Sequence, residues 1–380
     1  MKRIGAILAS AALLLTLAFG LGSCAGGNDG GLSRLNLVGE YTRDLAGTTL
    51  NVVNWGEFIA AGQGPCGLDI VRAFQELTGI RVNYTHFSTN EDLYLRFFGP
   101  AMGGASIDLT FPSDYMIQRL IAEDSLNPIN FDNIPNFRFI QEEFQSGLWF
   151  DPESRYSVPY VWGMTGLIYN YTLVEESPTS WEALWNEAYA GQILQFESSR
   201  DAFAVAQFIL GLDVNSTNPD DWYAAAELLK AQAPLVQAYV ADEIYAIMIG
   251  ENAFLGPYYA GDFMLMSTYN ENLRFVYPEE GVNFFVDSMV IPASANNQAG
   301  AEMFINFLLE PDVALGNANA VYYAFPHTEV VNNPDFLRHG NPVLFPAEED
   351  MPITQLFEDL PPEIISLKNR LWNEVRQIRP

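Results

Sequence analysis

The first half of the chain alternates segments with strand and helix patterns. Residues 49–54 are β-branched and apolar and predict a strand, whereas apolar side chains at every third position over 68–77 predict one face of a helix. The same signs predict a strand over 80–87, a helix capped by Asn90 and a short strand over 107–111. Repeated strand–helix units predict a parallel sheet with helices on both faces. The alternation therefore favours an α/β fold.

The second half continues the pattern less regularly. The expected elements are helices that begin at 114 and 181 and helices over 202–210, 222–231 and 301–309, with a strand over 284–291. Pro311 is expected to halt the last of these helices. With 380 residues, of which 49% are hydrophobic, the chain can bury two cores of ordinary size. We therefore expect two α/β lobes, each a mostly parallel sheet flanked by helices.

The N-terminus has the layout of a secretory signal. A basic start at residues 1–3 precedes the uncharged apolar run 4–19, which is shorter than the roughly 20 residues of a membrane-spanning helix. Residues 1–23 are therefore predicted to be removed. Leu21-Gly22-Ser23-Cys24 resembles the lipobox of bacterial lipoproteins and predicts a lipid on Cys24, although a plain signal peptide with a coincidental cysteine is the alternative. The glycine-rich residues that follow predict a flexible tether over 24–47.

The net charge is strongly negative, because 18 Lys and Arg stand against 47 Asp and Glu and give −29. Such a field repels nucleic acid and anionic lipid headgroups and favours cations. Acidity also keeps an exported protein soluble, so the charge supports a cationic ligand without establishing one. No nucleic-acid partner is expected.

Cysteine and histidine usage predicts neither a disulfide framework nor a metal site. With Cys24 consumed by lipid, Cys66 has no partner and is read as a free thiol in a loop. His86, His327 and His339 lie far apart in the sequence, and none pairs with a cysteine or carboxylate at metal-ligand spacing. No cofactor or metal is therefore expected.

Seven short strings stand out along the chain, namely NWGEF at 54–58, LTGIRV at 77–82, IDLTFPS at 107–113, SVPYVWG at 157–163, SW at 180–181, DSMVIP at 287–292 and INFLLEPDVA at 305–314. They occur in the same order as in one known family, the bacterial spermidine/putrescine-binding proteins, which the chain resembles from about residue 48 to 326. Each string alone is weak, but seven in order form a specific pattern.

The resemblance implies a two-lobed periplasmic-binding-protein fold of type II, the Venus flytrap, with the ligand in the cleft. The N-terminal lobe would comprise residues 48–162 and 287–332, and the C-terminal lobe residues 163–286 and 333–380. Binding in this family closes the lobes by hinge rotation, and a membrane permease recognises the closed form.

The resemblance also implies a set of ligand-binding residues. These are Trp55, Glu57, Phe58, Ser113, Tyr115, Ser198, Asp201, Phe285, Asp287 and Tyr323. Asp201 and Asp287 would hold ammonium groups, and Trp55, Tyr115 and Phe285 would wall the methylenes. Each of three residues also has a purely structural interpretation. Asp287 could end a strand, Trp55 could be part of the core, and Asp201 could be an acid favoured at the start of a helix.

The chain departs from the family pattern at several of these positions. Phe58 replaces a tyrosine and Phe285 a tryptophan, while Ser198 replaces a second acid, with Glu197 one residue earlier. The tryptophan expected in the second lobe is read as Ile249. Glu251, two residues on, and Glu358, near the C-terminus, are further candidates, but for them and for Glu197 a solvated surface position is the stronger interpretation.

The function that the resemblance implies is that of a substrate-binding lipoprotein of an ABC importer, which captures spermidine or putrescine and delivers it to the permease. A polyamine is a string of ammonium groups joined by methylenes, so its site needs carboxylates at the charges and aromatic walls along the linkers. With 13% aromatic residues the acidic chain supplies both. We expect a monomer in the periplasm, anchored to a membrane by its lipid.

Other functions stay open. A binding protein for a sugar, an amino acid or a ferric ion would use similar side chains, and a polyamine sensor would pass its closed form to a receptor. An enzyme such as a glycoside hydrolase would need two opposed carboxylates with separated pKa values. No Gly-x-Ser-x-Gly elbow, glycine-rich phosphate loop or His–carboxylate cluster occurs in the sequence, so catalysis is not expected.

Overall fold

The computed structural model describes residues 29–62, 67–99 and 106–378. The predicted signal segment, the lipidation site Cys24 and the thiol of Cys66 lie outside these ranges. Within them, no helix has the length and apolarity needed to cross a membrane.

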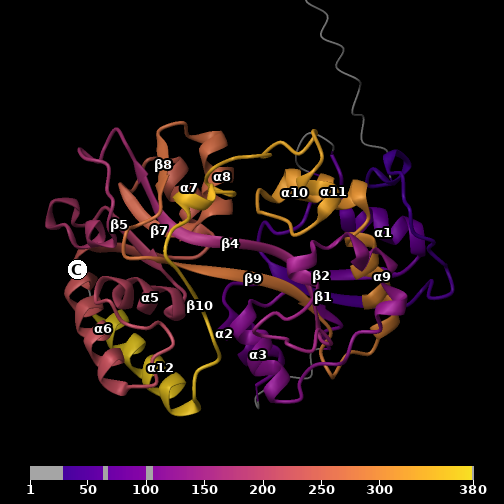
Figure 1. The fold of residues 1–380 in the computed structure, drawn as a ribbon, viewed down its shortest axis with the longest axis horizontal. Coiled ribbons are helices and arrows are strands. Elements are labelled where there is room, and N and C mark those ends of the chain that lie inside the picture. The colour runs from indigo at the N-terminus through magenta and orange to yellow at the C-terminus, as the bar shows by residue number, and fades with distance from the viewer. Residues whose placement is uncertain (1–28, 63–66, 100–105, 379–380) are drawn as a thin grey trace, which may run out of the picture.

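The described residues form two lobes that share a mixed sheet (Figure 1). Its main path runs β2-β1-β3-β9-β4-β7-β5-β6, and β10 and β8 pair with β9 and β4. The strands are β1 Thr49–Trp55, β2 Arg81–Phe87, β3 Leu109–Thr110, β4 Ser157–Asn170, β5 Ile193–Phe196, β6 Val236–Val240, β7 Leu255–Tyr259, β8 Leu273–Val276, β9 Val282–Val290 and β10 Thr354–Leu356. The two-lobed α/β fold predicted from the sequence is confirmed.

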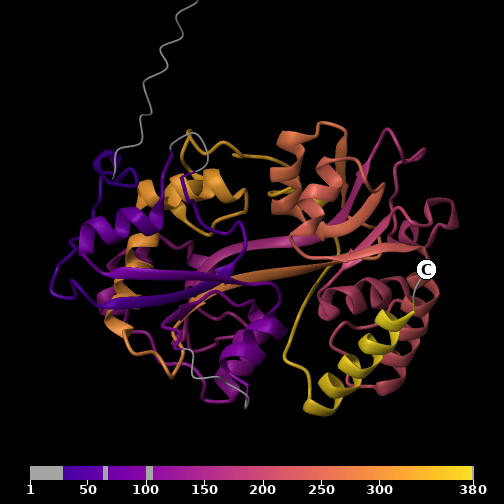
Figure 2. The ribbon, with the colours of Figure 1, turned by 180° about the vertical axis from the view of Figure 1, so that it is seen from behind.

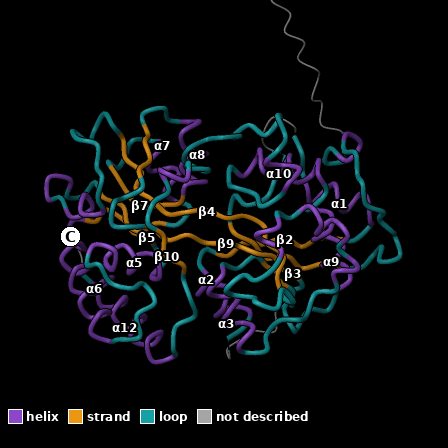
Figure 3. The backbone as a smooth tube through the Cα atoms, in the orientation of Figure 1, coloured by secondary structure: helices purple, strands orange, loops and turns teal. Residues whose placement is uncertain are grey.

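Helices surround the strands in both lobes (Figure 3). They are α1 Ile70–Thr78, α2 Asn90–Phe97, α3 Asp114–Ala122, α4 Glu142–Gln145, α5 Ser199–Ile209, α6 Pro219–Gln232, α7 Glu243–Ile249, α8 Ala260–Tyr269, α9 Gln298–Leu308, α10 Pro311–Val321, α11 Thr328–Val331 and α12 Pro362–Gln377. Local chemistry sets several ends. Asp69 caps α1 by accepting the N–H of Arg72, and Gly79 ends that helix at a φ of 76°, where glycine carries no Cβ penalty.

Two long strands connect the lobes. β4 and β9 run antiparallel across the middle of the molecule (Figure 1). The first part of β4, from Ser157 to Met164, pairs with β9, and the part from Thr165 onward pairs with β7 and β8 of the other lobe. The sheet is parallel within β2-β1-β3 and within β7-β5-β6. The long strands pair antiparallel with each other and with β3, β7 and β8, whereas β10 pairs in parallel with β9. These strands place residues of both lobes beside the cleft.

Each lobe has its own large apolar core. One core includes Leu50, Phe74, Phe111, Phe304 and Phe307, all fully buried. The other includes Trp181, Phe203, Trp222, Leu255 and Val282, also fully buried. The second core also includes Met116, Ile117 and Leu120 of α3, so apolar contacts cross the junction of the lobes. The boundaries at 162/163, 286/287 and 332/333 stay predictions, and the two long strands that join the lobes are where a hinge is expected.

The N-terminal stretch 32–45 packs on the first lobe, on the side where α1, α9 and α10 lie (Figure 2). Its apolar side chains Leu32, Leu35, Leu37, Tyr41 and Leu45 contact that core. The fully buried carboxylate of Glu310 accepts hydrogen bonds from the N–H groups of Val38, at 2.7 Å, and Gly39, at 2.8 Å. The flexible tether predicted over 24–47 is therefore wrong for this stretch, because hydrogen bonds and apolar contacts hold it.

Some smaller predictions also need correction. Thr89, not Asn90, caps α2, because its hydroxyl accepts the N–H of Asp92 at 3.0 Å. The helix expected after Ser180 is a 3₁₀ helix, Trp181–Trp185. Pro311 follows the end of α9, and it is also the first residue of α10. At that position the missing N–H of proline costs no helix hydrogen bond.

Candidate functional site

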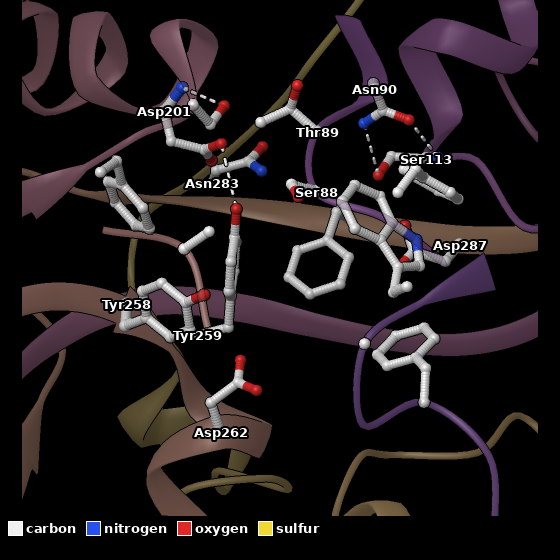
Figure 4. A pocket seen from close by; sticks show the side chains of 18 of the residues that line it. Ser88, Thr89, Asn90, Ser113, Asp201, Tyr258, Tyr259, Asp262, Asn283 and Asp287 are labelled. Atoms are coloured by element: carbon white, nitrogen blue, oxygen red, sulfur yellow. Dashed lines mark hydrogen bonds between the residues drawn. The ribbon is translucent and has the colours of Figure 1, made fainter. Parts of the chain in front are cut away.

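A cavity of about 840 Å³ lies where the two lobes meet (Figure 4). It is lined by Trp55, Gly56, Phe58, Phe87, Ser88, Thr89, Asn90, Ser113, Asp114, Tyr115, Phe196, Ser198, Asp201, Val240, Ala241, Asp242, Tyr258, Tyr259, Asp262, Asn283, Phe285, Asp287, Tyr323 and Phe357. Most of these residues end a strand or begin the following helix, so the fold gathers them at the strand ends.

The lining of the cavity is acidic and aromatic. Five of the lining residues are aspartates and ten are aromatic, and no Lys, Arg or His is among the described residues that line it. No group of three or more His, Cys, Asp or Glu in the described ranges could hold a metal ion. The cavity therefore suits an organic cation better than an anion or a metal.

Asp287 occupies the middle of the cavity wall on β9, opposite Ser113 in an antiparallel bridge. Its side chain is buried, and among the described residues its Oδ1 has no hydrogen-bond partner. Burial, and secondarily the charges of Asp201 and Asp262, raise the pKa of this carboxyl to about 7. Since this oxygen is itself buried, a donor in the cavity would reach it only after the carboxyl group rotates.

Asp201 comes from the second lobe, in the first turn of α5. Ser198 caps this helix and its hydroxyl accepts the N–H of Asp201, so the serine that replaces an acid has a structural role here. The hydroxyl of Tyr259 donates to Oδ2 of Asp201 at 3.1 Å (Figure 4). Burial raises the pKa of Asp201 to about 6, although hydrogen bonds between its carboxyl and the side chains of Ser198 and Tyr259 act in the opposite direction.

Asp262 is a third buried acid, which the sequence analysis missed. It lies in the first turn of α8, and its Oδ2 accepts a hydrogen bond from the hydroxyl of Tyr323 at 2.5 Å. The hydroxyl of Tyr245 donates to its other oxygen. Burial raises the pKa of Asp262 to about 7, and the charge of Asp242 adds to that rise.

Tyr259 is a second residue that the sequence analysis missed. It ends β7, its ring meets that of Phe285 edge-on at 5.5 Å, and it stands between Asp201 and Asp262 (Figure 4). The position that we read as the second-lobe aromatic, Ile249, lies in α7 and does not line the cavity. The available signal was the strand-to-helix turn around Tyr259, the same kind of turn that revealed Ser113.

The aromatic wall of the first lobe is fixed by its own contacts. The indole N–H of Trp55 donates to the carbonyl of Phe111 at 2.7 Å, and the Trp55 ring lies 4.2 Å from that of Phe87. Phe58 packs edge-on against Tyr323 at 4.9 Å. Because these contacts already hold the rings in place, their faces are available to a cation and to methylene groups.

Nine of the ten principal predicted residues line the cavity. They are Trp55, Phe58, Ser113, Tyr115, Ser198, Asp201, Phe285, Asp287 and Tyr323. Glu57 does not line it, because this residue takes a left-handed φ of 49° and its side chain is exposed. Their contact with a ligand stays a prediction.

The lower-ranked acids lie elsewhere. Glu197 pairs with Arg376 at 2.8 Å on the surface. Glu251 accepts a hydrogen bond from the side chain of Asn272 at 2.8 Å, which lowers the Glu251 pKa. Glu358 lines a different cavity between the lobes. None of the three faces the main cavity.

Comparisons with known proteins agree with this architecture. A family model described as bacterial extracellular solute-binding protein matches residues 69–341. The spermidine/putrescine-binding periplasmic protein of Escherichia coli K12 is 32% identical over 73% of this chain and 78% of its own length. The putrescine-binding periplasmic protein of the same organism is 26% identical over 86% of this chain and 91% of its own length.

Solved structures give the same result. The spermidine/putrescine ABC transporter substrate-binding protein PotD from Streptococcus pneumoniae superposes with a TM-score of 0.68 at 32% identity and covers 87% of this chain and 98% of its own. A lipoprotein of Treponema pallidum superposes with a TM-score of 0.71 at 24% identity, over 86% of this chain and 99% of its own, and supports the fold.

Proposed function

The chain belongs to the bacterial extracellular solute-binding proteins, and we propose that it captures a polyamine in its cleft and delivers it to the permease of an ABC importer. Spermidine and putrescine are the cargoes named for its relatives at 32% and 26% identity. These relatives are binding proteins, and we propose no catalytic role for the chain.

The observation that carries the proposal is the charge balance of the cleft. Asp201, Asp262 and Asp287 are buried around one cavity, and no basic side chain is among its described lining residues. Burying a carboxylate without a cation is costly, so the cleft is built for a cation that comes from outside. The unpartnered Oδ1 of Asp287 is where we place one ammonium group.

The aromatic lining suits the methylene linkers between the ammonium groups of a polyamine. Trp55, Tyr259 and Phe285 present ring faces and edges between the acids, where methylene linkers would lie. Each cation–aromatic contact contributes about 0.5–2 kcal/mol. Closure of the lobes excludes water and strengthens the charge-assisted hydrogen bonds, and this preference for the closed state drives the motion.

The same lining argues against two alternatives. An amino acid presents a carboxylate, and the described lining offers it no basic partner. A ferric ion would need a cluster of ligands that the described residues do not form. We propose further that the protein is exported, is held at a membrane by a lipid on Cys24 and acts as a monomer.

The test is isothermal titration with putrescine, cadaverine, spermidine and spermine at physiological salt. The chain would be produced from residue 24 on with Cys24→Ser, and a sugar panel serves as the control. Micromolar or tighter binding of one polyamine, with no heat from the sugars, is expected. No binding of any of the four by folded protein would overturn the proposal.

A further inference from the structure

A second cavity, of about 630 Å³, lies behind the cleft at the junction of the lobes. On one side it is bounded by residues of α2 and α3, and on the other by residues 358–360 and α12. Tyr115 lines both this cavity and the cleft, so its ring forms part of the wall between them.

A buried ion pair joins the two sides of this junction. Nζ of Lys368, on α12, lies 2.9 Å from Oε1 of Glu91, on α2. The side chain of Lys368 is 3% exposed and that of Glu91 is 26% exposed. The other ion pairs found in the described residues leave both side chains at least 21% exposed, so this pair is distinct in its burial.

Two further contacts cross the junction beside the ion pair. The N–H of Asp359 donates to Oε1 of Gln118, on α3, at 2.7 Å. The ring of Phe357 meets that of Tyr115 edge-on at 5.9 Å. The segment that leads into α12 therefore touches the first lobe at this edge.

The ion pair is connected to the cleft through its neighbours. The hydroxyl of Tyr115 lies 3.4 Å from both carboxylate oxygens of Glu91. The residue before Glu91 is Asn90, which lines the cleft and donates to the hydroxyl of Ser113 at 3.0 Å. A shift of Glu91 would thus move residues that we expect to contact the ligand.

We propose that Glu91 and Lys368 form a latch that holds the lobes closed and keeps Tyr115 in place against the ligand. Lys368 acts through Glu91 and is a positioning residue. The inference deepens the proposed function, because it identifies part of what sets the closed state that a permease would receive.

The physical reason lies in the burial of the pair. Water has little access to Lys368, so its charge depends on Glu91 for compensation. Glu91 is less dependent on Lys368, because its side chain is 26% exposed and the buried Arg200, which lines the same cavity, also lowers its pKa. Removing one partner leaves a buried charge without compensation, which is strongly destabilising, whereas removing both costs little. Single substitutions should therefore open the junction, and the double substitution should open it less.

The test is hydrogen exchange at the amide of Asp359, in protein from residue 24 on with Cys24→Ser, measured both without ligand and with saturating spermidine. That amide is protected only while it donates to Gln118 across the junction. Lys368→Met and Glu91→Gln should each speed its exchange on the order of tenfold or more, the double variant should speed it less, and Lys368→Arg should restore protection.

The matched control is Lys230→Met. Lys230 also pairs with a residue of α12, Glu374 at 2.9 Å, but that contact stays within one lobe. It should leave the exchange of the Asp359 amide unchanged. Unchanged exchange in Lys368→Met, or faster exchange along the whole of α12 and α6, would overturn the latch, because the second result means a structural role inside the lobe.

Titration of the same variants with putrescine and spermidine separates the latch from the proposed function. The latch predicts affinities several-fold weaker in Lys368→Met and recovery in Lys368→Arg. Junction opening in a protein that binds no polyamine would contradict the function and support the latch. Polyamine binding with an unaffected junction would support the function and contradict the latch.

Discussion

The junction and the cleft lie side by side and hold buried acids in opposite states. At the junction burial would raise the pKa of Glu91, but the charge and hydrogen bond of Lys368, together with a backbone hydrogen bond and the charge of Arg200, outweigh burial and lower the pKa. In the cleft burial raises the pKa of Asp287 and Asp262 to about 7, because no basic residue lies among the described residues around them. The junction therefore contains its own cation, Lys368, whereas in our proposal the cleft receives its cation from solution.

The largest expected effect is that of Asp287→Asn on polyamine binding. The amide keeps the shape and removes the charge, so the affinity should fall by about 1.5–3 kcal/mol, the usual contribution of a hydrogen bond to a charged group. Isothermal titration measures the effect. The control is Glu197→Gln, also acid to amide, at a surface ion pair that should change the affinity by less than about 0.5 kcal/mol. Equal polyamine affinities for Asp287→Asn and the wild type would contradict the proposal that the Asp287 carboxylate binds an ammonium group.

The next effect concerns the stability of the empty protein. The pKa of Asp262 is about 7 in the folded state against an ordinary 3.8, so its ionisation opposes folding. Its stabilising contribution is fully present below pH 3.8 and is lost as the pH rises through 7. Asp262→Asn, which never ionises, should therefore unfold with a free energy higher by about 1–3 kcal/mol at pH 8, and the gap should vanish near pH 4.

Denaturant unfolding at several pH values, on protein freed of ligand by unfolding and refolding, checks this prediction. A gap of constant size across the pH range would mean that packing, not charge, separates the two proteins. If Asp262→Asn were less stable than the wild type at pH 8, this would contradict the claim that ionisation of Asp262 destabilises the empty protein.

The smallest effect is expected for Tyr259→Phe. The variant keeps the ring against Phe285 and loses the hydrogen bond to Asp201, which costs about 0.5–1.5 kcal/mol. Polyamine affinity should fall by a few-fold only. A loss as large as that of Asp287→Asn would show that the tyrosine hydroxyl, not the carboxylates, dominates recognition.

Local sequence patterns predicted the strands, the helices and the fold class, whereas the family resemblance supplied the candidate site residues that lie on them. Trp55 and Ser113 stand at strand ends, where the alternation of strands and helices places cleft residues. Asp287 sits within a strand that its neighbours identify. The fold class follows from the same alternation.

The features that the sequence did not predict depend on contacts between residues that are far apart in the chain. The role of Tyr259 follows from the pairing of β7 with β4, whereas the family resemblance pointed to Ile249, which does not line the cavity. Lys368 and Glu91 are 277 positions apart and carry no periodic signal. The sequence predicts that the stretch 32–45 continues the glycine-rich tether, yet its leucines contact the first core and Glu310 binds its backbone.

The most direct test of the central claim is the number of protons released when a polyamine binds. Near pH 6 the cleft acids are partly protonated, since the pKa values of Asp201, Asp262 and Asp287 are about 6, 7 and 7, and a bound cation would lower them. Titration with the tightest-binding polyamine in buffers of different ionisation enthalpy should show net proton release near pH 6 that fades above pH 8. Binding without proton release near pH 6 would mean that the cleft already contains its counter-charge, and would contradict the account.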